Sequence, residues 1–283
     1  MRIASFRRPD GTASFGRIEG DSIADCGTPG RDAWLKDALA SGTELAAMTA
    51  TGTFALADVT LLPVLPNPAK ILCVGLNYAT HVAETGREQK DYPAIFHRWA
   101  DTLVAHGASL VCPPESTRFD YEGELAVIIG PNPENPSGRR IAKGDAMAHV
   151  AGFAVFNDAS VRDWQRHNIQ FTPGKNFPAT GGFGPAMVTP DEIGDLGAQR
   201  VQTRLNGQLV QDQPVSDMIW DIPTVIAYCS TFTALEPGDV IATGTPGGVG
   251  DKRNPPLYMK AGDTVEVSIG TIGTLTNSVA NEA

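Results

Sequence analysis

Two glutamates separated by one glycine, Glu122 and Glu124, open an apolar, β-branched run in the segment FDYEGELAVIIG. Residues i and i+2 of a strand point to the same face, so both carboxylates should converge on one point. Two like charges held that close repel each other unless a cation lies between them or one carboxylate is protonated. The pair therefore indicates either a hard metal ion or an acid–base pair.

Asp158 ends the apolar run HVAGFAVFND, where a strand passes into a polar loop. Asp is common at strand ends as a turn former, which is the ordinary explanation for this residue alone. Joined to Glu122 and Glu124, it completes a set of three oxygen donors without His or Cys. That set is expected for Mg²⁺ or Mn²⁺ with water positions left open. Surface-facing glutamate pairs on strands are also common, so residue types alone leave both interpretations standing.

His81 and Glu84 stand at positions i and i+3 of GLNYATHVAETG, a segment that favours a short helix. This spacing lets the carboxylate meet the imidazole. A histidine oriented by a carboxylate is a standard base for removing a proton from water at neutral pH. An exposed helical pair worth about 0.2–0.5 kcal/mol explains the same spacing, and spacing alone favours that simpler explanation.

Lys175 lies in FTPGKNFPATGGFGP, which is too rich in Gly and Pro for regular structure. A loop lysine is usually only solvated, but near a metal it could polarise a carbonyl or neutralise an enolate. The segment GTPGGVG at 244–250 is not a phosphate loop, because it lacks the Gly-Lys-Ser/Thr ending and no helix start follows it. Its backbone N–H groups and the Thr245 hydroxyl could hold a carboxylate, or it could be a plain glycine turn.

The segments that must position these residues are mostly strands. ILCVG, ELAVIIG, HVAGFAVFND and TVEVSIGTIGTL are strand-like, and 201–211 favours a hairpin with Asn206-Gly207 in a type I′ turn. Helices are expected at 222–232, with Pro223 in the first turn, and in ASVRDWQRHNIQF. Regular β-α-β alternation and internal repeats are lacking, which disfavours doubly wound and barrel folds. A mixed, mainly antiparallel β architecture fits better.

Three prolines, Pro63, Pro66 and Pro68, make LLPVLPNPAK a stiff, extended connector. Before it, short strands with turns at 9–11 and 28–30 and a helix near 32–47 are expected. We therefore predict a small N-terminal domain at 1–66 and a main domain at 67–283.

The composition is that of an ordinary globular chain of 283 residues, 42% apolar and 19% charged. Its 22 basic and 32 acidic residues give a net charge of −10, which disfavours nucleic acid or an anionic membrane surface as a partner. An anionic substrate would need local positive charge. The N-terminus lacks the apolar region of a signal peptide, and no stretch approaches the ~18–20 apolar residues of a membrane span. A soluble, cytoplasmic protein is predicted.

The cysteines are far apart in the sequence and lack the spacing of a zinc site. Free, partly buried thiols in a reducing compartment are the simplest interpretation. The four residues are Cys26, Cys73, Cys112 and Cys229.

Five motifs, in this order, resemble the fumarylacetoacetate hydrolase family, specifically its shorter bacterial members of the acylpyruvase or diketo-acid hydrolase kind. They are GLNYATHVAE, FDYEGELAVIIG, FNDASVRDWQ, TPGKNF and IATGTPGGVG. The resemblance covers about 70–250. It implies an α+β, mainly β fold, a mixed β-sandwich roll preceded by a small N-terminal domain, and a homodimer.

The resemblance also implies roles for particular residues. They are the divalent-metal ligands Glu122, Glu124 and Asp158, the water-activating pair His81 and Glu84 on a lid segment, the carbonyl-contacting Lys175, and Gln165 and Thr245 at positions that hold substrate oxygens.

The chain departs from its relatives at two places. Several relatives carry Phe-x-Lys-Pro where this chain has IFHRWADTLVAHGASLV, so Arg98, or else His97 or His106, is expected to replace that lysine in binding the substrate. Asn77 stands where the longer, eukaryotic-type members use an additional acidic ligand. This second departure supports a site of three carboxylates.

The leading hypothesis is a Mg²⁺- or Mn²⁺-dependent hydrolase that cleaves a carbon–carbon bond in a small β-diketo acid. An acylpyruvate, a fumarylpyruvate or a diketo-deoxy sugar acid from aromatic or sugar acid catabolism would be the substrate. His81, oriented by Glu84, would deprotonate the attacking water. Lys175 and the metal would stabilise the oxyanion and the enolate leaving group.

Two alternatives stay open. The first is decarboxylation of a β-keto acid such as oxaloacetate, or keto–enol isomerisation of a dienoate, at the same metal site. The pair of His81 and Glu84 favours hydrolysis, because decarboxylation needs no attacking water. The second is a non-catalytic protein in which the three carboxylates hold a structural Ca²⁺, against which open coordination positions argue.

Overall fold

The computed structural model describes residues 1–28 and 34–282, and its largest element is a twelve-stranded sheet. Ten strands follow the order β4-β3-β2-β1-β14-β12-β11-β17-β6-β7, while β5 pairs with β1 and β8 pairs with β14. The strands are β1 (Arg2–Arg7), β2 (Ala13–Glu19), β3 (Ser22–Asp25), β4 (Gly52–Ala55), β5 (Thr60–Leu61), β6 (Ile71–Gly75), β7 (Ala94–Arg98), β8 (Leu103–Val104), β11 (Gly123–Ile129), β12 (Val150–Asp158), β14 (Gly181–Val188) and β17 (Val240–Ala242).

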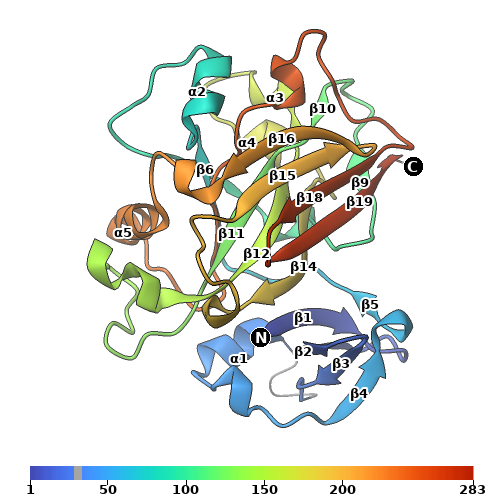
Figure 1. The fold of residues 1–283 in the computed structure, drawn as a ribbon, viewed down its shortest axis with the longest axis vertical. Coiled ribbons are helices and arrows are strands. Elements are labelled where there is room, and N and C mark those ends of the chain that lie inside the picture. Colours follow the sequence, from blue (N-terminus) through green and yellow to red (C-terminus); the bar gives the residue numbers. More distant parts are fainter. Residues whose placement is uncertain (29–33, 283) are drawn as a thin grey trace.

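A second sheet of five strands has the order β16-β15-β18-β19-β9, and β10 pairs with β13 in a short ribbon. These strands are β9 (Leu110–Cys112), β10 (Phe119–Asp120), β13 (Ser160–Val161), β15 (Arg200–Leu205), β16 (Gln208–Pro214), β18 (Thr264–Ile269) and β19 (Gly273–Asn281). Figure 1 shows β15, β16, β18 and β19, gold to red, in front of β11 and β12. Most pairs are antiparallel, as predicted.

Strand β11 is buried along its whole length, and its side chains alternate between two cores. Leu125, Val127 and Ile129 pack in one core with residues of the five-stranded sheet and of helix α5. Ala126 and Ile128 pack in the other core. Burial of a large apolar side chain stabilises the fold by roughly 1.5–3 kcal/mol. The strand that carries Glu124 is therefore held from both sides, and the predicted α+β, mainly β architecture is confirmed.

The N-terminal strands extend the large sheet, because β1 pairs with β14 through Ile3 opposite Met187. They lie at the lower end of the molecule in Figure 1, in blue. Ile3 and Phe15 share a core with Ile128. The division at residue 66 stays a prediction.

The helices are α1 (Leu35–Ala40), α2 (Ala79–Thr85), α3 (Arg162–Gln165), α4 (Thr172–Lys175) and α5 (Ile222–Phe232). The 3₁₀ helices are η1 (Leu45–Ala47), η2 (Leu56–Asp58), η3 (Ala100–Thr102), η4 (Lys143–His149), η5 (Pro190–Glu192), η6 (Val215–Asp217) and η7 (Gly250–Lys252). Helix α5 has the predicted bounds, and the Asp221 side chain caps it by accepting the Thr224 N–H. None of the described helices is long and apolar enough to cross a bilayer.

Three local predictions need correction. The helix expected at 32–47 is interrupted after α1, because Gly42 adopts a left-handed φ of 69°. Residues 32 and 33, and most of the turn expected at 28–30, lie outside the described residues. The segment after Asp158 is helical only in α3, and the Gly/Pro-rich segment around Lys175 contains α4 and the start of β14.

The hairpin between β15 and β16 is confirmed. Asn206 and Gly207 both have positive φ, 52° and 80°, as a type I′ turn requires.

Candidate active site

A cavity of about 340 Å³ lies where the ends of β6 and β11 meet helices α2, α3 and α4. The glycine-rich segment 244–250 and the two residues that follow it complete the wall. The predicted site residues that line the cavity are His81, Glu122, Glu124, Gln165, Lys175 and Thr245. They come from segments far apart in the sequence, and the order of the strands in the large sheet brings them together.

The three carboxylates predicted as metal ligands form one buried cluster. Each of Glu122, Glu124 and Asp158 offers an oxygen that lies within 4.8 Å of the others. The register of β11 on β12 causes this, since Gly123 pairs with Asn157 and the Asp158 N–H donates to the Glu122 carbonyl at 2.8 Å. A side chain at Gly123 would overlap the Thr203 hydroxyl of β15, so the residue between the two glutamates must be small.

Two of the carboxylates are paired with protein cations. The Lys175 ammonium lies 2.6 Å from Glu122 Oε2 and 2.5 Å from Asp158 Oδ2. Arg162 Nη1 lies 2.6 Å from Glu122 Oε1. Burial alone would raise the pKa of Glu122, but Lys175 and Arg162 outweigh it and lower this pKa to about 2.

Glu124 makes no ion pair with any residue that the structure describes, and its Oε2 accepts the Gly244 N–H at 2.8 Å. Burial, with Asp158 and Glu122 nearby, raises the pKa of Glu124 well above its usual range. A buried carboxylate beside two others is stabilised by a hard cation, and three oxygen donors are the set that Mg²⁺ or Mn²⁺ takes. The residues therefore fit a divalent metal ion.

The pair predicted on α2 is formed. His81 Nδ1 lies 2.7 Å from Glu84 Oε1, and His81 is buried at the cavity wall. Because Nδ1 is engaged, Nε2 is the ring nitrogen left to exchange a proton with a ligand in the cavity. Spacing alone favoured an exposed pair, and burial of His81 excludes that explanation.

The glycine-rich segment holds carboxylates of the protein itself. Besides Gly244 to Glu124, Gly248 donates its N–H to Glu84 Oε2 at 2.7 Å, and Gly250 donates to Asp120 Oδ1 at 2.8 Å. Gly244 and Gly248 have φ of 101° and 103°, which favour glycine. Sequence reasoning left open whether this segment holds a carboxylate or is a plain glycine turn, and its N–H groups bond carboxylates of the protein itself.

Gln165 and Thr245 both lie at the cavity wall, as predicted from the resemblance. Gln165 Oε1 accepts from Arg162 Nη1 at 3.0 Å. The Thr245 hydroxyl donates to the Gly123 carbonyl at 2.9 Å and accepts from Gln211 at 2.8 Å. Thr245 thus connects the glycine-rich segment to Gly123, the residue between the two glutamates.

The prediction that Arg98 binds the substrate needs correction. Its guanidinium is fully buried, pairs with Asp158, and donates to the Ala159 carbonyl and to the Thr180 hydroxyl. Arg98 is not among the cavity-lining residues. Its side chain is buried behind the cavity wall, where it holds the Asp158 carboxylate. The same geometry explains why an arginine suits this position, since its planar fork bonds several acceptors at once.

His97, His106 and Asn77, which stand where the chain departs from its relatives, do not line the cavity either. His97 is exposed on β7, and His106 Nδ1 accepts the Thr276 N–H at 3.1 Å. Asn77 is buried, with its amide bonded to the Trp220 backbone and to the Thr243 carbonyl. The side chain of Asn77 thus connects β6 to β17 and is not free for a ligand.

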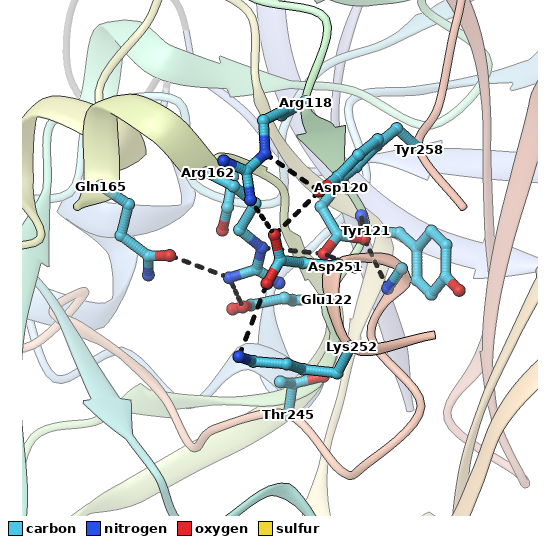
Figure 2. A network of polar contacts seen from close by, with 12 residues as sticks. Arg118, Asp120, Tyr121, Glu122, Arg162, Gln165, Thr245, Asp251, Lys252 and Tyr258 are labelled. Atoms are coloured by element: carbon cyan, nitrogen blue, oxygen red, sulfur yellow. Dashed lines mark hydrogen bonds and ion pairs between the residues drawn. The ribbon is translucent and has the colours of Figure 1, made fainter. Parts of the chain in front are cut away.

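Sequence reasoning missed the polar network shown in Figure 2. In it, Arg162 is paired with both Asp120 and Glu122, and Asp251 is paired with Arg118. Asp251 also pairs with Arg166. Asp120 precedes Glu122 by two residues, the same spacing that drew attention to Glu124, so this signal was present.

Five basic side chains line the cavity, although the whole chain is acidic. They are Arg87, Arg162, Arg166, Lys175 and Lys252. They provide the local positive charge that an anionic substrate needs. The four cysteines are free thiols, as predicted, and none lines this cavity.

Comparison with known proteins identifies relatives. The model of a protein family described as fumarylacetoacetate (FAA) hydrolase, C-terminal, matches residues 70–280. A mitochondrial oxaloacetate tautomerase of Rattus norvegicus and an oxaloacetate tautomerase of Bacillus subtilis are each 41% identical to this chain. The matched regions span 78% and 80% of this chain and 70% and 75% of those proteins.

A solved structure resembles this one along its whole length. It is maleylpyruvate hydrolase from Sphingobium sp. SYK-6 in complex with manganese(II) and pyruvate, with a TM-score of 0.79 and 26% identity over 100% of both chains.

Proposed function

Because the chain belongs to the fumarylacetoacetate hydrolase family, we propose that it is a divalent-metal-dependent tautomerase that interconverts the keto and enol forms of a small β-keto acid, with oxaloacetate as the first candidate. The observation that carries the proposal is that His81, bonded to Glu84, lies buried at the wall of the cavity beside the carboxylate cluster. The names of two relatives at 41% identity support tautomerisation over the hydrolysis that we predicted first.

Glu122, Glu124 and Asp158 would hold the metal, and a bound divalent cation supplies Lewis-acid stabilisation of negative charge on the substrate oxygens. Lys175 adds a fixed positive charge. Burial alone would lower the pKa of Lys175, but Asp158 and Glu122 outweigh it and raise this pKa. We assign Lys175 the role of a positive charge beside the substrate oxygens.

His81 carries the proton. In the keto-to-enol direction the C3–H bond of the substrate breaks, its proton goes to Nε2, and its electron pair forms the C2–C3 double bond while the π pair of the C2 carbonyl moves onto its oxygen. The protonated ring then returns the proton to that oxygen, so the imidazole ends as it began. Glu84 keeps Nδ1 bonded throughout and stabilises the imidazolium between the two transfers.

Arg162 and Gln165 are placed to bind the substrate carboxylate. Arg162 lines the cavity, and its Nη2 is buried and makes no hydrogen bond to any residue that the structure describes. An unpaired buried donor costs roughly 1–3 kcal/mol, so a carboxylate oxygen that reached Nη2 would gain by bonding it.

The test is a spectrophotometric assay. Enol oxaloacetate is added to the purified protein with Mg²⁺ or Mn²⁺, and loss of the enol absorbance is followed. Total oxaloacetate is measured in parallel with malate dehydrogenase. We expect faster enol loss with total oxaloacetate unchanged, and no acceleration in EDTA. Enol loss no faster than in protein-free buffer with the same metal would contradict the proposal.

Hydrolysis of a diketo acid is the second candidate, because the similar solved structure is a maleylpyruvate hydrolase holding manganese(II) and pyruvate. The same histidine could activate water in place of the C3 proton. A panel of acylpyruvates, fumarylpyruvate and diketo sugar acids separates the two, since only hydrolysis releases two carboxylic acids.

A further inference from the structure

Asp120, at the end of β10, has a carboxylate that is completely buried and fully bonded (Figure 2). Oδ1 accepts the N–H groups of Tyr121 and Gly250 at 2.9 and 2.8 Å. Oδ2 accepts the Asp251 N–H at 2.9 Å and Arg162 Nε at 2.8 Å. A carboxylate offers about four acceptor sites, so Asp120 has none left for a ligand. It is also not among the cavity-lining residues.

The Arg162 guanidinium is fixed on two of its three nitrogens. Asp120 holds Nε, while Glu122 and Gln165 hold Nη1 at 2.6 and 3.0 Å. The group is planar, so two fixed nitrogens determine where Nη2 lies. Glu122 and Gln165 both line the cavity, where a bound metal ion or substrate would compete with Arg162 for them. Among these three anchors, Asp120 is the one outside the cavity wall.

Asp120 also joins Arg162 to the cavity rim. Its bonds to the Gly250 and Asp251 N–H groups fix the turn that carries the Asp251 side chain. Asp251 in turn pairs with Arg118 at 2.6 Å and with Arg166, which lines the cavity. The buried carboxylate of Asp120 thus fixes the Arg162 guanidinium. It also fixes the turn whose Asp251 side chain pairs with Arg166.

We propose that Asp120 is a positioning residue that presets the Arg162 guanidinium for the carboxylate of the substrate. The inference rests on the proposed function, in which Arg162 binds that carboxylate. A preset donor loses little freedom on binding, which lowers the cost of association and fixes the substrate against His81. Loss of a contact that orients a metal ligand typically costs 10–100-fold, and we take the same range for this contact to a substrate-binding group.

The test compares Asp120→Asn with Asp163→Asn. Asparagine has the same size, but its amide cannot accept hydrogen bonds at both positions of the carboxylate. Asp163 is the matched control, because it neighbours Arg162 in the sequence, accepts from the Ser116 hydroxyl at 2.7 Å and does not line the cavity. Calorimetry measures Mn²⁺ affinity, and then oxalate affinity of the Mn²⁺-loaded protein.

We expect oxalate affinity to fall about 10–100-fold in Asp120→Asn, with Mn²⁺ affinity unchanged and Asp163→Asn like the wild type. In oxaloacetate kinetics KM should rise more than kcat falls, and the Arg162 Nε–H resonance should shift only in Asp120→Asn. Wild-type oxalate affinity in Asp120→Asn overturns the proposal. These binding readouts need no turnover, so an inactive wild-type protein would refute the tautomerase proposal without deciding this one.

Asp120→Asn could fail to fold, because Asp120 also bonds three backbone N–H groups. Arg162→Lys then serves as the second variant, since it keeps the charge and leaves Asp120 in place, but lysine lacks the rigid fork. We expect the same loss of oxalate affinity in a folded protein. Wild-type affinity in Arg162→Lys, or unfolding of both variants, overturns the proposal.

Discussion

Gly248 donates its backbone N–H to Glu84 across 164 positions of the sequence, at 2.7 Å, and Glu84 in turn holds His81 at 2.7 Å. The glycine-rich segment therefore orients the pair to which we assign proton transfer. A segment without reactive side chains of its own thus supports the proposed catalytic base, His81.

Gly248→Ala tests this link. With φ of 103°, alanine is strained there, and its Cβ would overlap the Val210 carbonyl oxygen, so the backbone that bonds Glu84 must shift. We expect kcat to fall about tenfold or more, since small misplacements of catalytic groups cost up to ~100-fold. Gly207→Ala is the control, because Gly207 also has positive φ but faces open space in the β15–β16 turn. If kcat fell equally in both variants, backbone strain alone would explain the loss. The hydrogen bond from Gly248 to Glu84 would then have no role in catalysis.

Glu124→Gln tests the metal site. The substitution keeps the size of the side chain but removes the charge of the carboxylate that lacks a protein cation. We expect Mn²⁺ affinity, measured by calorimetry, to fall more than the roughly 10–100-fold that loss of an outer-shell contact costs. Glu134→Gln, at an exposed position, should bind Mn²⁺ like the wild type. Unchanged affinity in Glu124→Gln would place the metal elsewhere.

Arg98→Lys tests the correction made above. Lysine keeps the charge but cannot bond Asp158, the Ala159 carbonyl and Thr180 together. We expect a lower midpoint of thermal unfolding and weaker Mn²⁺ binding, with little change in KM at saturating metal. A large rise in KM with unchanged Mn²⁺ affinity would instead restore the substrate-binding role.

Asp221→Ala tests the cap of α5, far from the chemistry. The Thr224 N–H loses its acceptor, so the free energy of unfolding at pH 7 should fall by about 0.5–2 kcal/mol in urea titrations, with activity unchanged. Burial acts to raise the pKa of Asp221, but bonds from Lys143 and Thr224 outweigh it and lower this pKa. A lowered folded-state pKa means that the stabilisation is complete above about pH 4 and is lost as the pH falls further. A difference that persists undiminished at low pH would contradict this account.

The sequence predicted the parts of the fold that depend on local rules. Continuous apolar runs identified β11 and β12, the Asn206-Gly207 pair identified its hairpin, and Pro223 marked the start of α5. The pairing of β1 with β14 was not predictable, because hydrogen bonds between residues 3 and 187 leave no local pattern. The helix near residue 40 was predicted to be too long. The apolar spacing continues past Gly42, but the helical backbone ends at Ala40.

The site residues that belong to the five motifs could be predicted from the sequence. The contacts of a side chain that has several possible partners could not. Glu122, Glu124 and Asp158 converge as the strand register requires. Arg98 was wrongly assigned to the substrate, because sequence cannot tell whether an arginine points into a cavity or behind a carboxylate. Homodimeric assembly and a cytoplasmic location stay predictions, and light scattering during gel filtration tests the first.

The measurement that tests the central claim most directly is a ¹³C NMR time course of oxaloacetate with Mg²⁺ and catalytic amounts of protein. One sample separates the enol, the keto form and its hydrate from pyruvate, and from oxalate and acetate. We predict rapid approach to keto–enol equilibrium with the summed oxaloacetate forms conserved, and a rate about 10²–10⁴-fold lower for His81→Gln. Pyruvate formed in proportion to the protein would show decarboxylation, and oxalate with acetate would show hydrolysis; either would contradict the proposal.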